Sequence, residues 1–219
     1  AGDDTVAYAV AAAGGSLNGG AGNDTLVVTA NSAIAGLSEV SGFEVLRAVG
    51  SATHNAHTFK ALEVGAGTNT FTNVAAGVGL TVLDATTQTT KVTLLSSGGT
   101  ADVFDLTLKS AGTIDAGDVV LAGVETININ SVDTDTITGA NTNKLKLTAI
   151  DAKSIVVTGN TNIDFATSTG GATTAAKVTS FDASNATGNI EYTSANATIG
   201  EIVTIKGGAG DDILTGTAS

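Results

Sequence analysis

Two stretches of nine residues carry the residue types that bind a metal ion. Gly19–Val27 fits the pattern Gly-Gly-x-Gly-x-Asp-x-apolar-x without a mismatch, and Gly207–Thr215 fits it again. A third copy, Ala1–Ala7, lacks only the first two glycines. Glycine permits a tight turn in which backbone carbonyls point inward, and the aspartate adds a charged oxygen. Because Ca²⁺ favours ~6–8 oxygen ligands, the pattern predicts the calcium-binding turns of a parallel β-roll.

Each ion in such a roll lies between two stacked turns about 18 residues apart, because one nonapeptide makes half a coil. Asp4 and Asp24 are 20 residues apart, so they face each other if the opposite turn is two residues longer. Gly14–Asn18 is the expected position of that turn. The alternative is a glycine-rich hairpin loop in which Asn and Asp serve only as turn formers. The predicted ligands are the Asp4 and Asp24 carboxylates and the carbonyls of Ala1, Asp3, Gly20 and Gly22, with Gly19 and Asn23 as weaker candidates.

Three acidic groups in the middle of the chain are secondary candidates for calcium ligands. Each places two carboxylates at short spacing, and each is equally well interpreted as a solvated turn. The pair Asp115 and Asp118 is the better candidate, because its Gly and Asp spacing resembles that of the nonapeptide turn. The groups are Asp115 with Asp118, Asp133 with Asp135 beside Asn141 and Asn143, and Asp102 with Asp105.

Catalytic patterns are missing from the sequence. His54 and His57 are three residues apart and would share one face of a helix, as transition-metal ligands do. No third ligand lies near them, so a solvated turn is the better interpretation. The sequence contains no Gly-x-Ser-x-Gly elbow, no cysteine nucleophile and no Gly-Lys-Ser/Thr phosphate loop. We therefore expect that the protein is not an enzyme.

The charge balance narrows the choice of partners. The chain has 21 acidic and 9 basic residues, a net charge of -12, which argues against nucleic acid and anionic membrane surfaces. No apolar run approaches the ~20 residues of a membrane helix, so we expect no membrane insertion. The absence of cysteine excludes disulfides and thiolate zinc sites. Because the first residue falls inside a repeat, we expect a fragment of a longer chain.

The apolar content favours strands. Hydrophobic residues make up 42% of the chain but aromatic residues only 4%, so the core must be aliphatic. Phe43, Leu62 and Leu80 recur at intervals of 19 and 18 residues, close to one coil of two strands and two turns. The spacing predicts an all-β, right-handed parallel β-solenoid, and the alternative is a β-sandwich inserted between two roll segments. The expected segments are a calcium roll over 1–30, a solenoid over 31–205 and a second, truncated calcium segment over 206–219.

A partial internal repeat supports the solenoid. Gly42–Leu46 is similar to Gly123–Ile127, since each has a Gly, an apolar residue, a Glu and then alternating apolar positions. The only segment with a helical pattern is 56–62, with 53–55 leading into it. We therefore expect strands throughout, apart from this one short helix.

The nonapeptides are the signature of RTX (repeats-in-toxin) proteins. Over nearly its whole length the chain also resembles the C-terminal part of the calcium-dependent surface-layer protein of stalked alphaproteobacteria. The resemblance implies type I secretion, a location on the extracellular cell surface and assembly into a two-dimensional lattice. It implies Ca²⁺ as the cofactor, and as partners the lattice neighbours and other regions of the same chain. The stretches that carry it are Gly42–Ala48, His54–Ala56, Thr70–Ala75, Val78–Leu83, Leu121–Thr126 and Ala152–Asn160.

The resemblance also assigns roles within the nonapeptides. Because Ser194, 18 residues before Asp212, is not acidic, we expect the last turn to pair with a turn beyond Ser219. Two other functions stay open within the family: the accessory roll region of an RTX enzyme such as a lipase or protease, and a binding module of an RTX adhesin. The residues assigned are Asp4, Asp24 and Asp212 as side-chain ligands, and Gly20, Gly22, Gly208 and Gly210 as turn glycines.

Overall fold

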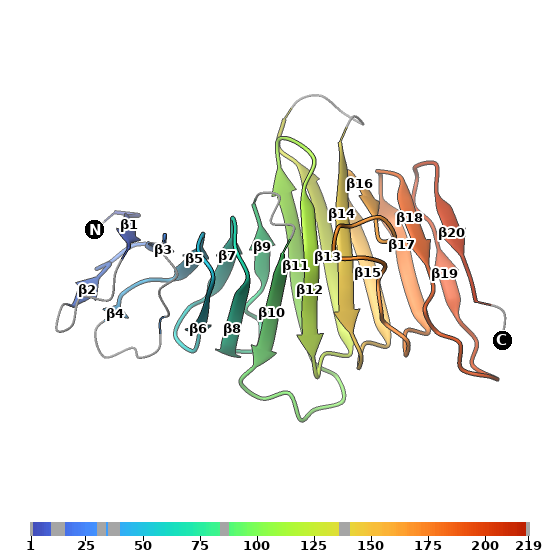
Figure 1. The fold of residues 1–219 in the computed structure, drawn as a ribbon, viewed down its shortest axis with the longest axis horizontal. Coiled ribbons are helices and arrows are strands. Elements are labelled where there is room, and N and C mark those ends of the chain that lie inside the picture. The colour runs from blue at the N-terminus through green and yellow to red at the C-terminus, as the bar shows by residue number, and fades with distance from the viewer. Residues whose placement is uncertain are drawn as a thin grey trace.

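The chain winds as a stack of coils that place their strands in two long parallel sheets (Figure 1). The structure, a computed structural model, describes residues 2–9, 16–29, 34, 40–83, 88–135 and 141–217. Neighbouring strands within these ranges pair in parallel, and successive odd or even strands are adjacent. The predicted parallel β-solenoid is confirmed, and the β-sandwich alternative is wrong. No helix occurs in the described part of the chain, so none there is able to span a membrane.

Alternate strands belong to alternate sheets. The ten-stranded sheet contains β1 (Thr5–Tyr8), β3 (Thr25–Val28), β5 (Val45–Ala48), β7 (Ala61–Val64), β9 (Leu80–Val82), β11 (Val103–Ser110), β13 (Thr126–Asp133), β15 (Ser154–Gly159), β17 (Ser180–Ala186) and β19 (Thr204–Lys206). The eight-stranded sheet contains β6 (Ala52–Asn55), β8 (Asn69–Val74), β10 (Thr89–Leu94), β12 (Asp115–Ala122), β14 (Thr142–Ala149), β16 (Asn162–Asp164), β18 (Ile190–Thr193) and β20 (Ile213–Thr215). A small third sheet joins β2 (Leu17–Asn18) to β4 (Val40–Ser41). The strand β3, before the segment boundary predicted at 30, pairs with β5 after it, and β19 contains the boundary predicted at 205.

The core lies between the two sheets and is built from columns of aliphatic side chains. Along strands such as β3 and β14, buried and partly exposed positions alternate, because successive side chains point to opposite faces. Parallel, in-register pairing then places equivalent residues of successive coils above one another. One column runs through Leu26, Leu46, Leu62, Leu80, Leu106, Ile129 and Val157. Phe43, which suggested the coil length, is outside this column because it lies in the turn before β5.

The coils change size along the stack. Cross-coil contacts join residues 20 apart near the N-terminus and 16 apart between β5 and β7. In the middle they join residues 28 to 30 apart. Strand length follows this trend, from four residues in β1 to eight in β11–β14, which widens the stack in Figure 1. The extra residues of the larger coils therefore lengthen strands and turns without changing the alternation of inward-facing and outward-facing side chains.

One segment, 165–175, leaves the regular path after β16, and we call it the strap. Ser168 Oγ donates hydrogen bonds to Asp115 Oδ1 (2.8 Å) and to the Gly117 carbonyl (3.1 Å). The Thr169 N–H donates to Asp115 Oδ2 (3.0 Å). Thr174 then forms an isolated parallel bridge with Thr148 of β14. The strap thus fastens β16 to β12, which lies two strands away in the eight-stranded sheet.

Two expectations about local structure are wrong. The segment 56–62 is not a helix: residues 56–60 form the corner between β6 and β7, where the Phe59 N–H donates to the Ala56 carbonyl, and residues 61–62 begin β7. Ala56, Phe59 and Leu62 are buried at a spacing of three, which imitates a helical face in the sequence. The turn expected around Asp115 is the start of β12, with a register irregularity between Asp115 and Asp118.

Candidate calcium site

Acidic residues of three successive coils form a column at the strand starts. Asp4, Asp24 and Glu44 immediately precede β1, β3 and β5. The Asp4 N–H donates to Asp24 Oδ1 (2.7 Å), and the Asp24 N–H donates to Glu44 Oε2 (3.0 Å). The Asp24 and Glu44 carboxylates therefore each accept the backbone N–H of the equivalent residue in the preceding coil, 20 residues earlier. The structure thus places the Asp4 backbone beside the Asp24 carboxylate, and Glu44 extends the column.

The second oxygen of Asp24 has no hydrogen-bond partner. Asp24 is 0% exposed, and its Oδ2 atom is buried. Leaving a buried polar atom unsatisfied costs about 1–3 kcal/mol, and more when the group is charged. A cation bound beside Asp24 Oδ2 would remove this cost. We therefore treat this atom as the centre of the candidate site.

Backbone oxygens line the same gap, because glycine lets two turns approach closely. A Cβ atom on Gly19 would lie 2.2 Å from the Gly42 carbonyl oxygen and 2.9 Å from Asp24 Oδ2. Gly42 has a φ of +68°, and a Cβ there would lie 2.7 Å from Asn18 Oδ1 and 3.2 Å from the Gly20 carbonyl oxygen. Carboxylate, amide and carbonyl oxygens are the ligands that Ca²⁺ prefers. Asp24 Oδ2 and the Gly42 carbonyl oxygen both lie beside Gly19, and oxygens of Asn18 and Gly20 lie beside Gly42, so the residues present fit calcium.

The first turn packs against the second, as the sequence predicted. The Asn23 N–H donates to Asp3 Oδ1 (2.8 Å), and a Cβ on Gly22 would lie 2.2 Å from the Gly2 carbonyl oxygen. Ala1 lies outside the described residues. No group of three or more His, Asp or Glu side chains suited to a metal occurs in the described ranges. A cation at Asp24 would thus depend on backbone oxygens as well as carboxylates.

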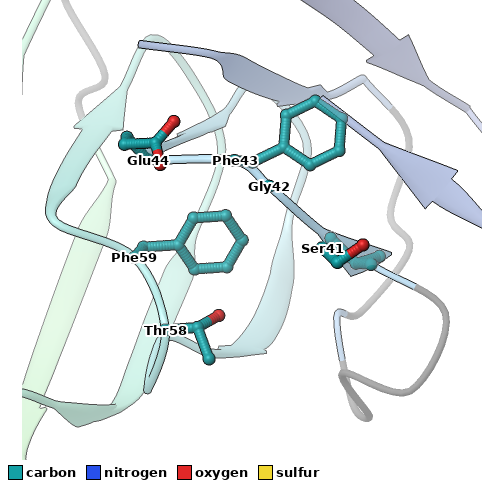
Figure 2. Close-up of a pocket in the computed structure, with 7 residues that line it drawn as sticks. Ser41, Gly42, Phe43, Glu44, Thr58 and Phe59 are labelled. Atoms are coloured by element: carbon teal, nitrogen blue, oxygen red, sulfur yellow. The ribbon is translucent and has the colours of Figure 1, made fainter. Parts of the chain in front are cut away.

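A pocket of about 330 Å³ opens beside the third coil. Figure 2 shows the Phe43 and Phe59 rings lining it, with Glu44 and Ser41 on opposite sides. Glu44 also accepts a hydrogen bond from Lys60 Nζ (3.3 Å). The hydrogen bond from the Asp24 N–H, with that from Lys60, holds the pKa of Glu44 below its ordinary value of 4.5. The pocket gives solvent a path to the carboxylate that follows Asp24 in the column.

The last nonapeptide is organised differently. Asp212 Oδ1 accepts the Ile190 N–H (2.8 Å), and Asp212 Oδ2 accepts the Gly208 N–H (2.8 Å). The residue of the preceding coil that faces Asp212 is therefore Ile190, 22 residues earlier, and not Ser194, which is 18 residues earlier. A Cβ on Gly210 would lie 2.6 Å from Asn189 Oδ1, which accepts the Asp211 N–H. Both Asp212 oxygens already have donors, which sets this turn apart from Asp24.

Two of the three secondary acidic candidates have protein partners, and the first of these is Asp115 with Asp118. Asp118 pairs with Lys146 Nζ (2.8 Å) and accepts from Thr148 Oγ1 (2.8 Å). Burial raises the pKa of Asp115, but hydrogen bonds from Thr169, Ser168 and Gly117 outweigh burial, and the pKa lies below its ordinary value. These contacts give both carboxylates a role in holding strands together.

Asp133 is the centre of the other acidic pair. It accepts hydrogen bonds from the Asp135 N–H (2.9 Å) and from Asn141 Nδ2 (2.8 Å), and these bonds lower its pKa. The structure therefore brings Asp133, Asp135 and Asn141 together. Asn143 is fully buried instead, where it accepts the Ile114 N–H (3.0 Å).

The two histidines occupy different environments. His54 is 0% exposed and stacks on Phe71 with ring centroids 5.6 Å apart. Its Nδ1 accepts the Ile34 N–H (3.4 Å), and its Nε2 lies 3.3 Å from Asn69 Oδ1. Burial lowers the pKa of His54 below 6.5. The expected solvated turn is therefore wrong for His54, which is a core residue, whereas His57 is exposed.

Sequence reasoning missed three residues of the candidate site: Asn18, Gly42 and Glu44. The constant step of 20 residues from Asp4 to Asp24 to Glu44 is the signal in the sequence that identifies the third member. No protein-family model matches the chain, and a search of curated proteins finds no match. The contacts around Asp24 therefore carry the functional argument.

Proposed function

We propose that this chain is a calcium-stabilised structural module of a secreted protein that assembles into a two-dimensional layer on a bacterial cell surface. The observation that carries the proposal is Asp24 Oδ2, a buried and unpartnered carboxylate oxygen in a glycine turn with backbone oxygens around it. The resemblance to RTX surface-layer proteins supplies the location and the lattice.

Calcium would act by stabilising the folded stack. A ligand that binds only the folded state shifts the folding equilibrium by mass action, by about 2.7 kcal/mol at 100 times its dissociation constant. The net charge of -12 adds a general reason, since bound divalent cations reduce the mutual repulsion of the carboxylates. Low calcium inside a cell would then disfavour folding, and external calcium would favour it.

Exposed isoleucines near the C-terminal end of the stack support contacts with neighbouring copies. Ile199 is 90% exposed and Ile202 is 86% exposed, in the segment between β18 and β19. Neighbouring exposed apolar side chains are typical of interaction surfaces. We propose that they contact another copy in the layer.

The test combines calcium titration with electron microscopy. With calcium, the melting temperature should rise and periodic sheets should form, and EGTA should reverse both effects. Ile199→Ser with Ile202→Ser should keep the calcium-dependent melting shift and lose the sheets, whereas the control Ile150→Ser, at a position 60% exposed, should keep both. An unchanged melting temperature with calcium would refute the calcium part. A shift without sheets would refute the layer and favour an accessory RTX region.

A further inference from the structure

The internal repeat of Gly-x-Glu marks two equivalent positions in the stack. Gly42 and Gly123 have φ values of +68° and +67°, and each lies two residues before a glutamate. Glu44 immediately precedes β5, and Glu125 immediately precedes β13. The sequence contains the Gly-x-Glu pattern only at these two places. The repeat therefore builds the same turn twice.

Each of these glutamates faces an aspartate of the preceding coil. The Asp24 N–H donates to Glu44 Oε2 (3.0 Å), and the Asp102 N–H donates to Glu125 Oε2 (2.9 Å). Both aspartates immediately precede a strand of the ten-stranded sheet, β3 and β11. The hydrogen bond from Asp102 to Glu125 is therefore equivalent to the one from Asp24 to Glu44, although no complete nonapeptide surrounds Asp102.

The same two aspartates share an unsatisfied atom. Four buried side-chain polar atoms of the described residues lack a hydrogen-bond partner, and two of them are carboxylate oxygens. These two are Asp24 Oδ2 and Asp102 Oδ2. Every Gly-x-Glu turn in the chain therefore faces an aspartate with a buried, unpartnered oxygen. Both positions combine a Gly-x-Glu turn with a buried, unpartnered carboxylate oxygen, which points to the same kind of ligand at each position.

The surroundings of Asp102 favour a cation. Glu125 is only 9% exposed, and none of the ion pairs among the described residues includes Asp102 or Glu125. Asp102 is half-buried with its Oδ2 atom buried, and two neighbouring carboxylates withdrawn to this extent without a counter-charge are destabilising. A Cβ on Gly123 would lie 2.9 Å from the Ser97 carbonyl oxygen and 3.1 Å from Ser97 Oγ. Oxygen donors and excess negative charge together suit a hard divalent cation.

We infer that the turns 97–102 and 123–125 bind a second divalent cation of the calcium type, held by Asp102 and Glu125 with oxygens of Ser97. The choice of calcium rests on the proposed function, whereas the choice of residues rests on the contacts of Asp102, Glu125 and Gly123. The site lies in the middle of the stack, far in sequence from any nonapeptide.

Isothermal titration with CaCl₂ after removal of bound metal tests the inference. Asp102→Asn and Glu125→Gln should each bind one ion fewer than the wild-type chain, or bind it at least about tenfold more weakly. Asp182→Asn is the matched control, because Asp182 lies on β17, pairs with Lys206 Nζ (2.9 Å) and belongs to neither candidate site. It should bind as the wild type does. Equal stoichiometry and affinity in wild type, Asp102→Asn and Glu125→Gln would overturn the inference.

Two further measurements keep the result interpretable. Asp24→Asn reports on the first site: if it loses an ion and Asp102→Asn does not, only the second site is refuted, and if the wild type binds none, both proposals fail. Melting in EGTA reports on folding. Glu125→Gln keeps an acceptor for the Asp102 N–H and should melt within about 2 °C of the wild type, so a loss of binding is then a loss of the site. A folded Glu125→Gln chain with unchanged calcium binding overturns the inference.

Discussion

Asp24→Asn should make the fold more stable than the wild type without calcium and less stable than the wild type with calcium. Asparagine keeps Oδ1 as the acceptor for the Asp4 N–H, and it replaces the unpartnered Oδ2 with an amide that can donate to a nearby carbonyl. Without calcium, the substitution removes a buried unsatisfied oxygen and should stabilise the fold by about 1–3 kcal/mol. In a chain of this size, each kcal/mol raises the melting temperature by about 2–4 °C.

With calcium, the order should invert. The wild type gains about 2.7 kcal/mol when free calcium is 100 times the dissociation constant, and the variant loses most of this gain because a neutral amide binds Ca²⁺ weakly. Differential scanning calorimetry in EGTA and over a calcium series measures both effects, with Asp182→Asn, a carboxylate paired with Lys206, as the control. If Asp24→Asn is destabilised equally in both conditions, Asp24 has only a structural role, and the argument from its unpartnered oxygen is wrong.

Three further predictions concern the scaffold. Leu80→Ala should lower the free energy of unfolding by about 2–5 kcal/mol in denaturant titrations, because Leu80 is 1% exposed, whereas Leu95→Ala, at 51% exposure, should change it by less than about 0.5 kcal/mol. Gly159→Ala should destabilise by more than about 2 kcal/mol, because φ is +112° and its Cβ would lie 2.0 Å from a backbone carbonyl, whereas Gly98→Ala meets nothing within 4 Å and should be well tolerated in the same titrations. His54 should make stability depend on pH, because burial lowers its pKa in the folded state. As the pH falls below 6.5, the unfolded chain binds the proton first, so the stability of the fold decreases. His54→Asn should flatten this dependence in thermal melts measured from about pH 7 to about pH 5.

The sequence predicts the solenoid well because its core pattern is local and repeated. Leu62 and Leu80 are true neighbours in one column, and strands with alternating side chains stack in parallel as expected. Phe43 and residues 56–60 mislead for a common reason: both lie in corners, where buried residues follow the bend of the backbone and not a strand or helix period. The longer coils of the middle region were also unpredictable, because added residues fall in strands and turns without breaking the alternation.

Prediction of the candidate site from the sequence is limited for a different reason. The nonapeptide identifies Asp24 and its glycines, since those positions need particular backbone angles and an anionic oxygen. It does not reveal that Asp24 Oδ2 lies near the following turn, since Gly42 and Glu44 belong to no nonapeptide. The two complete nonapeptides also differ in the structure, because the coil before Asp212 has 22 residues and donates to it from Ile190. Which turns oppose one another depends on coil length, and that becomes visible only once the strands are paired.

The strap has a mechanical consequence. Ordinary contacts in the stack join adjacent coils, so a chain pulled from its C-terminal end releases one coil at a time. The strap instead joins residues 51 to 54 apart through Asp115 and Gly117. A pulling force must therefore break the Ser168 and Thr169 bonds before β14 is able to peel away from β12. This places a rupture point in mid-stack, and it makes β12, β14 and β16 resist tension as one unit.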